Sequence, residues 1–199
     1  MLLAVLYKSA DALTGNSHFP GNLRKGQILV IVQFQRLLLF FGQKLAVKIE
    51  QNALLKARAI YELVHCCVVS DDSGLEVEAL GGEPGLWSAR YKGLETEHER
   101  RLAVLKGLEG SDNRRARFVT CICFIDETGE EHLFTGVWNG EIALREEGTN
   151  GFGYDPIFIS EDGNGKTTAS LPLSFKETYS HRAKAVRQLI SWLQSQKGF

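Results

Sequence analysis

The sequence predicts a single mixed α/β or α+β domain over residues 1–199, with helices on both faces of a mixed β-sheet. Three observations lead to this prediction. The chain has 199 residues, of which 44% are apolar and 24% charged, as in a soluble globular domain. Segments with helical spacing of apolar residues interleave with short strand-like runs. No repeat, low-complexity stretch or linker divides the chain.

The N-terminal part is expected to contribute strands. Residues 2–7 form a short apolar run, and Ile28–Phe41 form a longer one that contains two glutamines and Arg36. A membrane span needs about 20 apolar residues, so we interpret Ile28–Phe41 as one or two core strands. Residues 1–6 are too short for the apolar part of a signal peptide. We therefore expect a cytoplasmic protein without a membrane partner.

The next elements are a helix and two strands. Glu50–Val64 has apolar residues at helical spacing. Cys66–Ser70 is expected to be a short buried strand that ends at an acidic pair, and Leu75–Ala79 alternates as a second strand. A glycine- and proline-rich loop follows at residues 81–85.

The second half of the chain alternates in the same way. Glu95–Leu108 is predicted to be a helix with a charged face, and Arg117–Ile125 a strand. His132–Trp138 and Glu141–Leu144 are expected to be the following strands. Ser180 is a suitable N-cap for a final helix.

The four cysteines predict no metal knuckle or redox pair. Cys66 and Cys67 are adjacent, Cys121 and Cys123 are separated by one residue, and neither spacing is C-x-x-C. His65 beside the first pair allows a metal to be considered. We favour reduced thiols packed in a core.

Two carboxylates, Asp71 and Asp72, follow an apolar strand and precede Ser73-Gly74. Neighbouring side chains on a strand point to opposite faces, so a turn is expected to re-aim one of them. A carboxylate at a strand end is suited to Mg²⁺ or to a positioned water. An ordinary solvated turn is the alternative interpretation.

A glycine-rich segment, Gly148–Pro156, has a composition that suits a nucleotide base. Its three glycines permit positive φ angles, and Phe152 and Tyr154 offer stacking faces. Asp155 can accept hydrogen bonds from a base or a ribose. The segment lacks the strand-then-helix context of a dinucleotide fingerprint. An ordinary long turn explains it equally well.

A cluster of donors is expected at the start of the last helix. His181 and Arg182 follow the N-cap Ser180, and Lys176 precedes it by four residues. A helix N-terminus carries free N–H groups and partial positive charge, so the cluster suits an anion. Surface charges beside a simple cap are the alternative. No Gly-Lys-Ser/Thr follows the glycines near residue 15, which excludes a P-loop.

Together these segments resemble the inosine triphosphate pyrophosphatase family, the non-standard purine nucleoside-triphosphate pyrophosphatases. The resemblance runs from about Glu50 to the C-terminus, and its motifs occur in the family's order. They are Gln51–Arg58, Asp71–Leu75, Leu80–Gly85 leading to Ser88–Tyr91, Arg115–Phe118, Gly148–Pro156 and Ser180–Arg182.

The resemblance implies a long, twisted mixed sheet with flanking helices and two lobes around a substrate groove, usually as a homodimer. It implies Mg²⁺-dependent hydrolysis of ITP, dITP or XTP to a monophosphate and pyrophosphate. It also implies roles for single residues. Asp72 would be the general base and a metal ligand, Asp71 would support the metal, and the substrate would contact Ser73, Phe152, Gly153, Tyr154, Asp155, Lys176, His181 and Arg182.

Residues 1–45 depart from the family pattern. The family opens with a strand that ends in Thr-x-Asn-x-x-Lys, whereas Thr14-Gly15-Asn16 is followed by Phe19 at the lysine position. An acidic metal ligand is expected before the first helix, yet residues 37–47 contain no acid. Residues 1–49 also hold six basic residues against one acid. A divergent segment with the same task, a shifted reading frame or start, and a non-hydrolysing paralogue all explain this.

Two other function classes remain beside the enzyme. A nucleotide-binding protein without activity would fit the absent phosphate-binding loop. A nucleic-acid or membrane-surface module would have to use the basic residues before residue 50, but these are scattered and lack interleaved aromatics. The whole-chain net charge of −1 also gives no reason to expect stable nucleic-acid binding.

Overall fold

A computed structural model of the chain describes residues 5–7, 29–32 and 48–196. The chain forms two compact units. Unit 1 comprises Met1–Asp72, Cys121–Thr135 and Ala185–Phe199, and unit 2 comprises Ser73–Thr120 and Gly136–Lys184. Along the chain, the first segment of unit 1 ends at Asp72 and unit 2 begins at Ser73, within the predicted acidic motif.

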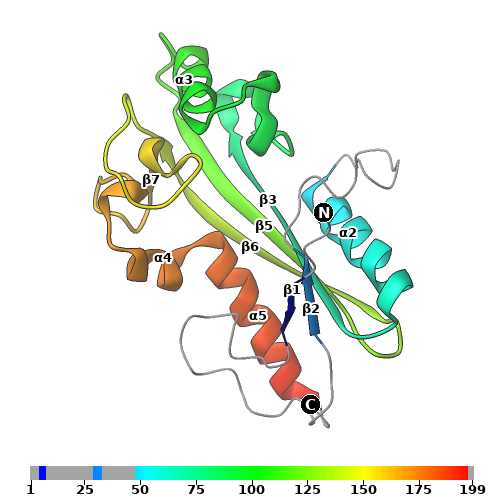
Figure 1. The fold of residues 1–199 in the computed structure, drawn as a ribbon. Helices are drawn as coiled ribbons and strands as arrows, with labels where there is room; N and C mark the ends of the chain where they lie inside the picture. Colours follow the sequence, from blue (N-terminus) through cyan, green and yellow to red (C-terminus); the bar gives the residue numbers. More distant parts are fainter. Residues whose placement is uncertain (1–4, 8–28, 33–47, 197–199) are drawn as a thin grey trace. The chain divides into compact units, whose positions relative to one another are not determined.

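The strands form one mixed sheet of seven strands in the order β1-β2-β3-β5-β6-β7, with β4 beside β3 (Figure 1). β2 runs antiparallel to β1 and parallel to β3, while β4 is antiparallel to β3 and β7 to β6. The mixed sheet with helices confirms the predicted fold class. The strands are β1 (Val5–Tyr7), β2 (Leu29–Val32), β3 (Val68–Val77), β4 (Pro84–Gly85), β5 (Arg115–Ile125), β6 (Glu131–Ile142) and β7 (Phe158–Ser160).

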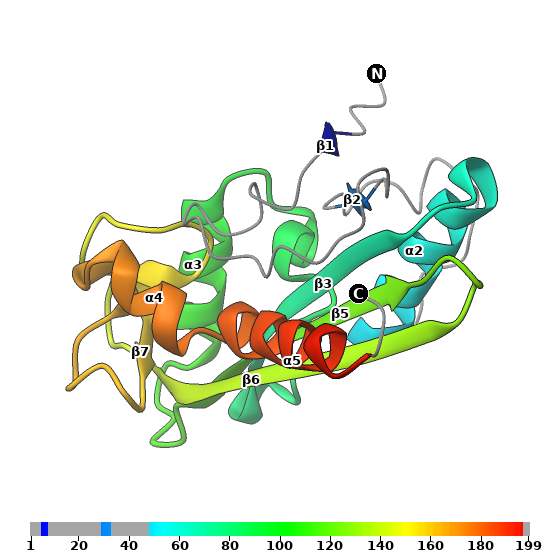
Figure 2. The same cartoon turned by 90° about the horizontal axis from the view of Figure 1, so that it is seen from below.

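In unit 1, helices α2 and α5 cover opposite faces of the strands (Figure 2). Helix α2 (Ile49–Val64) buries residues at helical spacing, among them Ala53, whose carbonyl accepts a hydrogen bond from the Ser70 hydroxyl of β3. On the other face, Val69 packs in one apolar cluster with Leu189 of α5 (His181–Ser195). In the part of β3 that belongs to unit 1, Ser70 and Asp72 therefore face α2, and Val69 faces α5.

Unit 2 has its own apolar core beneath helix α3 (Glu97–Gly107). Val104 of α3 packs there with Leu75, Phe118, Trp138 and other buried residues. Thr96 and Glu99 form a capping box at the start of α3, which fixes where the helix begins. The remaining helices are α4 (Leu173–Tyr179) and the 3₁₀ segments Glu78–Leu80, Ser88–Gly93, Asp155–Ile157 and Thr168–Ser170.

The three long helices confirm the sequence predictions, and the Ser180 hydroxyl accepts the predicted N-cap bond from Ala183 N at 3.2 Å. Two predicted breaks in strands are wrong. β3 runs through the acidic motif without a turn, and β6 is one strand where two were expected. β2 lies within Ile28–Phe41, which was predicted to form one or two strands, and β1 lies within the apolar run of residues 2–7. Thr14-Gly15-Asn16 and residues 37–47 lie outside the described residues.

The cysteines follow the prediction of reduced thiols. All four are free; Cys67, Cys121 and Cys123 are buried and Cys66 is partly exposed. Burial raises the pKa of the Cys121 thiol to about 11, so this thiol is protonated at neutral pH. Within residues 5–7, 29–32 and 48–196, no helix has the length and apolar character needed to cross a membrane.

Candidate active site

Asp72 is a buried carboxylate held by two side chains of α2. Its side chain is only 6% exposed, and Lys56 Nζ lies 2.8 Å from Oδ1. Asn52 donates to Oδ2 across 3.3 Å, and Lys56 also donates to the carbonyl of Asp71. Lys56 itself is 1% exposed. Because Asn52 and Lys56 are four residues apart, both project from the face of α2 that packs on β3.

Burial is the dominant influence on the Asp72 carboxyl group. It raises the pKa of Asp72 above its ordinary value, although Lys56 and the amide of Asn52 act in the opposite direction. A carboxylate with a raised pKa is a better proton acceptor than a solvated one, and such groups concentrate at functional sites. The geometry therefore supports a general base at this position.

Asp71 lies on the opposite face of β3 from Asp72. The strand is continuous here, so the prediction that a turn re-aims one of the two acids is wrong. The reason is that Ser70 and Asp72 both find partners on α2, which stabilises an extended chain through a polar run. The role of Asp71 at a metal stays a prediction.

Ser73 connects strand β5 with the start of α5. Its hydroxyl lies 2.6 Å from the hydroxyl of Thr120, and Arg182 Nη2 donates to it at 3.2 Å. Thr120 is completely buried. The predicted substrate residues Ser73 and Arg182 are thus brought together within unit 2, with Thr120 as a third member that the sequence did not indicate.

The buried carboxylate of Asp155 holds the glycine-rich segment together through hydrogen bonds. Its carboxylate is 4% exposed and accepts from Phe152 N at 2.8 Å, from Thr168 Oγ1 at 3.0 Å and from Lys176 Nζ at 2.5 Å. Gly151 has φ +79°, and a Cβ there would lie 2.0 Å from the Asp155 carboxylate. The loop closes only with glycine at that position. Contact of Asp155 with a base or ribose stays a prediction.

The two aromatic residues of the segment have different environments. Phe152 is 63% exposed, and Lys176 Nζ lies 4.7 Å from its ring centroid. Tyr154 is buried in the core of unit 2, where its hydroxyl donates to the Ser88 carbonyl at 2.7 Å. Of the two predicted stacking faces, only that of Phe152 is open to solvent. Tyr154 anchors the loop instead.

His181 is buried at the first turn of α5. Its ring stacks on Phe118 with centroids 4.8 Å apart and an interplanar angle of 10°. Burial, and then the charges of Arg182, Lys176 and Lys184, lower the pKa of His181 well below its ordinary value. Its Nδ1 is buried without a hydrogen-bond partner in the described part of the chain. The imidazole is therefore neutral at neutral pH.

Two groups of side chains are candidates for binding a metal ion. Mg²⁺ is usually held by one or two carboxylates together with substrate phosphates and water. Asp72 fits this pattern, because the contact of Oδ2 with Asn52 is long and leaves that oxygen able to bind a cation. The other set, Asp126, Glu130 and His132, has ligand atoms within 4.8 Å of one another. Asp126 Oδ1 there already accepts three hydrogen bonds that close the β5–β6 turn.

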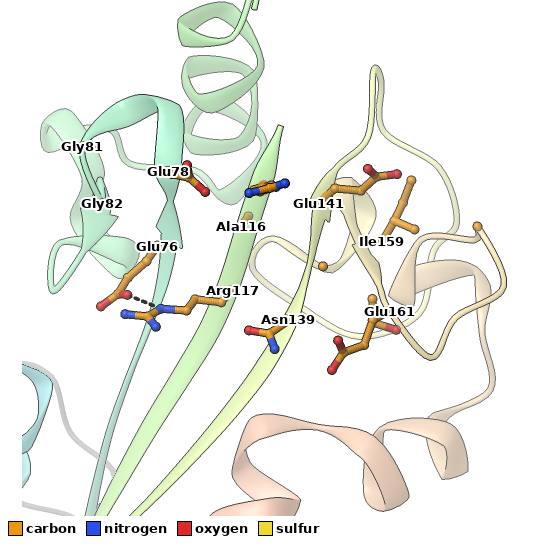
Figure 3. Close-up of a pocket in the computed structure, with 14 residues that line it drawn as sticks. Glu76, Glu78, Gly81, Gly82, Ala116, Arg117, Asn139, Glu141, Ile159 and Glu161 are labelled. Carbon is orange, nitrogen blue, oxygen red and sulfur yellow. Dashed lines mark hydrogen bonds and ion pairs between the residues drawn. The ribbon is translucent and has the colours of Figure 1, made fainter. Parts of the chain in front are cut away.

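Unit 2 also contains a cavity of about 820 Å³ (Figure 3). Polar side chains of β3, β5 and β6 line it, and Arg117 Nε pairs with Glu76 Oε2 at 2.7 Å. None of the predicted site residues lines this cavity. The cavity is therefore not part of the candidate site.

Sequence reasoning missed several residues that hold the site together. Lys56 and Asn52 were inside a motif quoted for the resemblance, Gln51–Arg58, but received no role. Thr120 and Thr168 carried no signal, because single threonines in apolar surroundings are common. Lys56 has the same helical spacing as the buried residues Ile49, Ala53 and Ile60. This spacing was the one sequence signal that could have indicated a buried lysine.

Comparison with known proteins decides the family. The family model described as "Ham1 family" matches residues 28–192, which extends upstream of the motifs quoted above. The chain belongs to the Ham1 family. A dITP/XTP pyrophosphatase of Flavobacterium johnsoniae is 47% identical over 150 residues, covering 75% of this chain and 77% of that protein. A dITP/XTP pyrophosphatase of Thermus thermophilus is 42% identical and covers 70% and 68%.

Solved Ham1 structures share the fold. The Ham1 protein of Staphylococcus aureus superposes with a TM-score of 0.74 at 40% identity, covering 78% of this chain and 81% of that one. The HAM1 protein of Coxiella burnetii gives 0.72 at 37% identity, covering 77% and 80%. These values show that the described fold of this Ham1 chain is that of its family.

Proposed function

We propose that the chain hydrolyses non-standard purine nucleoside triphosphates, namely ITP, dITP and XTP, to the monophosphate and pyrophosphate. The observation that carries the proposal is the buried Asp72 carboxylate, fixed by Lys56 and Asn52, in a chain whose similar relatives bear the name dITP/XTP pyrophosphatase. A buried, oriented carboxylate is what activation of water requires.

Asp72 accepts the proton of the attacking water in this reaction. The water oxygen forms a bond to the α-phosphorus, and the bond from that phosphorus to the bridging oxygen breaks, so that pyrophosphate leaves. Lys56 keeps the accepting carboxylate in one orientation, since its ammonium binds both Oδ1 and the Asp71 carbonyl. Mg²⁺, when bound by Asp72 and the phosphates, neutralises charge on the phosphate oxygens.

Selection of the base is assigned to residues of unit 2. The exposed ring of Phe152 stacks with the purine, and the donors of Arg182 meet an acceptor oxygen at its 6-position. Adenine carries an amino donor at that position, so the donors of the protein would be left unpaired. Neutral His181 adds no repulsive charge beside Arg182 and Lys176.

Pyrophosphate release from ITP by the full chain tests the catalytic assignment. Asp72→Asn is expected to lose about 10²–10⁴-fold in kcat, and circular dichroism checks that it is folded, because the change leaves the buried Lys56 without its charged partner. Asp112→Asn, at an exposed turn, is the matched control and is expected to behave like the wild type. A loss on Asp71→Asn as large as that on Asp72→Asn would assign the metal to both carboxylates. Near wild-type turnover by Asp72→Asn would refute the assignment.

The proposal also includes three properties that the family resemblance implies. They are Mg²⁺ as cofactor, a homodimer and a cytoplasmic location. Titration of Mg²⁺ against turnover, light scattering for molar mass and fractionation of cells test them in turn. A folded chain that binds inosine monophosphate but releases no pyrophosphate at any Mg²⁺ concentration would favour the non-hydrolysing alternative.

A further inference from the structure

The first turn of α3 holds both backbone groups of Gly153. Gly153 N donates to Glu97 Oε2 at 2.8 Å, and Arg101 Nη1 donates to Gly153 O at 2.8 Å. Glu97 and Arg101 are one helical turn apart and lie 3.7 Å from each other. The two peptide groups on either side of Gly153 are thus fixed by one pair of side chains. These peptide groups join Gly153 to Phe152 and to Tyr154.

Arg101 is itself held in place. Its guanidinium makes a two-pronged pair with Glu146, at 2.9 Å and 3.2 Å, and its side chain is 13% exposed. Burial would raise the pKa of Glu146, but the hydrogen bonds from Arg101 and His98 outweigh it, and the pKa is lowered. Glu146 is therefore ionised at neutral pH. Arg101 thus bridges Glu146, which precedes the glycine-rich segment, and Gly153, which lies within it.

The segment needs this restraint because of its sequence. Gly153 has φ +61°, and a Cβ there would meet nothing within 4 Å. No side chain packs at Gly153, so hydrogen bonds restrain this stretch: those of Glu97 and Arg101 to Gly153, and those between Phe152 and Asp155. Tyr154 on one side is anchored in the core, whereas the ring of Phe152 on the other side is largely exposed. The orientation of the Phe152 ring relative to the core therefore depends on the hydrogen bonds at Gly153 together with those that Phe152 makes to Asp155.

We propose that Glu97 and Arg101 are positioning residues for base selection, which act through Gly153 on the orientation of Phe152. This inference rests on the proposed function, because it names what the residues position the ring for. Helix-surface ion pairs usually join side chains to side chains and contribute little. Here Glu97 and Arg101 each also bind a backbone group of Gly153, next to Phe152. The pair therefore does more than stabilise the helix.

Kinetics and binding by four single variants test the inference. Arg101→Met keeps the aliphatic stem and removes the guanidinium, while Glu97→Ala removes the acceptor and Glu97→Gln retains it. Lys106→Met removes an exposed charge from the same helix and is the control. Each variant is assayed for pyrophosphate release from ITP and ATP, for calorimetric binding of inosine and adenosine monophosphates, and for thermal unfolding.

A displaced Phe152 ring predicts a specific kinetic pattern. Arg101→Met and Glu97→Ala raise KM for ITP and Kd for inosine monophosphate about 10- to 100-fold, as expected for a group shifted by about 1 Å. The ITP-to-ATP ratio of kcat/KM falls by a similar factor, while kcat changes little. Glu97→Gln stays closer to the wild type than Glu97→Ala, and Lys106→Met matches the wild type.

Several results would overturn the inference. Folded variants with wild-type selectivity would do so, as would a fall in kcat at constant KM, which a general structural defect produces. Glu97 is 48% exposed, so Glu97→Ala decides the matter if Arg101→Met does not fold. If the wild type binds inosine monophosphate but releases no pyrophosphate, the proposed function fails and the binding data alone decide the inference. A wild type that binds neither monophosphate contradicts both.

Discussion

Replacement of Lys56 by methionine tests the electrostatic design of the candidate site. Lys56 is completely buried, and its ammonium is paired with the buried carboxylate of Asp72 at 2.8 Å. Methionine fills a similar volume without a charge. In the Lys56→Met variant, Asp72 keeps only the long contact with Asn52 among the side-chain contacts described above.

The loss in unfolding free energy arises because the buried charge of Asp72 has lost its partner. Removal of one partner of a buried ion pair destabilises a protein by about 3–5 kcal/mol, because the remaining charge has lost water and gained no partner. The double variant Lys56→Met/Asp72→Asn has no unpaired charge and is expected to recover most of that loss. The coupling free energy between the two positions is then about 2 kcal/mol or more.

Urea unfolding followed by circular dichroism measures these free energies. The set consists of the wild type, both single variants, the double variant and the exposed control Lys106→Met. The control is expected to stay within about 0.5 kcal/mol of the wild type. A loss below about 1 kcal/mol for Lys56→Met, or a double variant as unstable as the sum of the singles, would refute the reasoning. Either result would mean that water or another group compensates Asp72.

Three further predictions concern unit 2. Thr120→Val removes the hydroxyl that meets Ser73 and should cost about 1–3 kcal/mol in unfolding free energy, with Thr120→Ser restoring it. Phe152→Ala should raise KM for ITP by about 5- to 150-fold, the equivalent of 1–3 kcal/mol of stacking, without loss of thermal stability. The lowered pKa of His181 means that the unfolded state binds its proton first, so stability is lost as pH falls below about 6.5. In His181→Gln the measured slope should decrease by up to about 1.4 kcal/mol per pH unit, and an unchanged slope would contradict the burial of a neutral imidazole.

Helices were predictable here because their signals are local. In α2 and in α5 the apolar residues that form the pattern are only three or four positions apart. The capping box of α3 likewise spans only Thr96 to Glu99. The two predicted strand breaks failed for a non-local reason. Separate strands were expected on either side of Gly140, but a Cβ at that position would lie 2.2 Å from the Ile159 carbonyl of β7. The glycine allows close approach of a neighbouring strand and does not end β6.

The same distinction applies to the candidate site. The acidic motif, the glycine-rich segment and the helix start were visible as local patterns of residue types. The partners that fix them were not, because Lys56 and Asp72 are 16 residues apart, and Arg182 and Ser73 are 109 apart. Nor could a pattern tell that Tyr154 is a buried anchor while Phe152 is exposed. Local sequence carries residue type, whereas burial and pairing depend on the tertiary fold.

The central claim is tested most directly by pyrophosphate release from ITP and from ATP, measured on the purified full-length chain with Mg²⁺ present. Our account predicts release from ITP with a kcat/KM about 10²-fold or more above that for ATP, because adenine would leave buried donors unpaired. Equal rates with the two nucleotides, or no release by a chain shown to be folded, would contradict it.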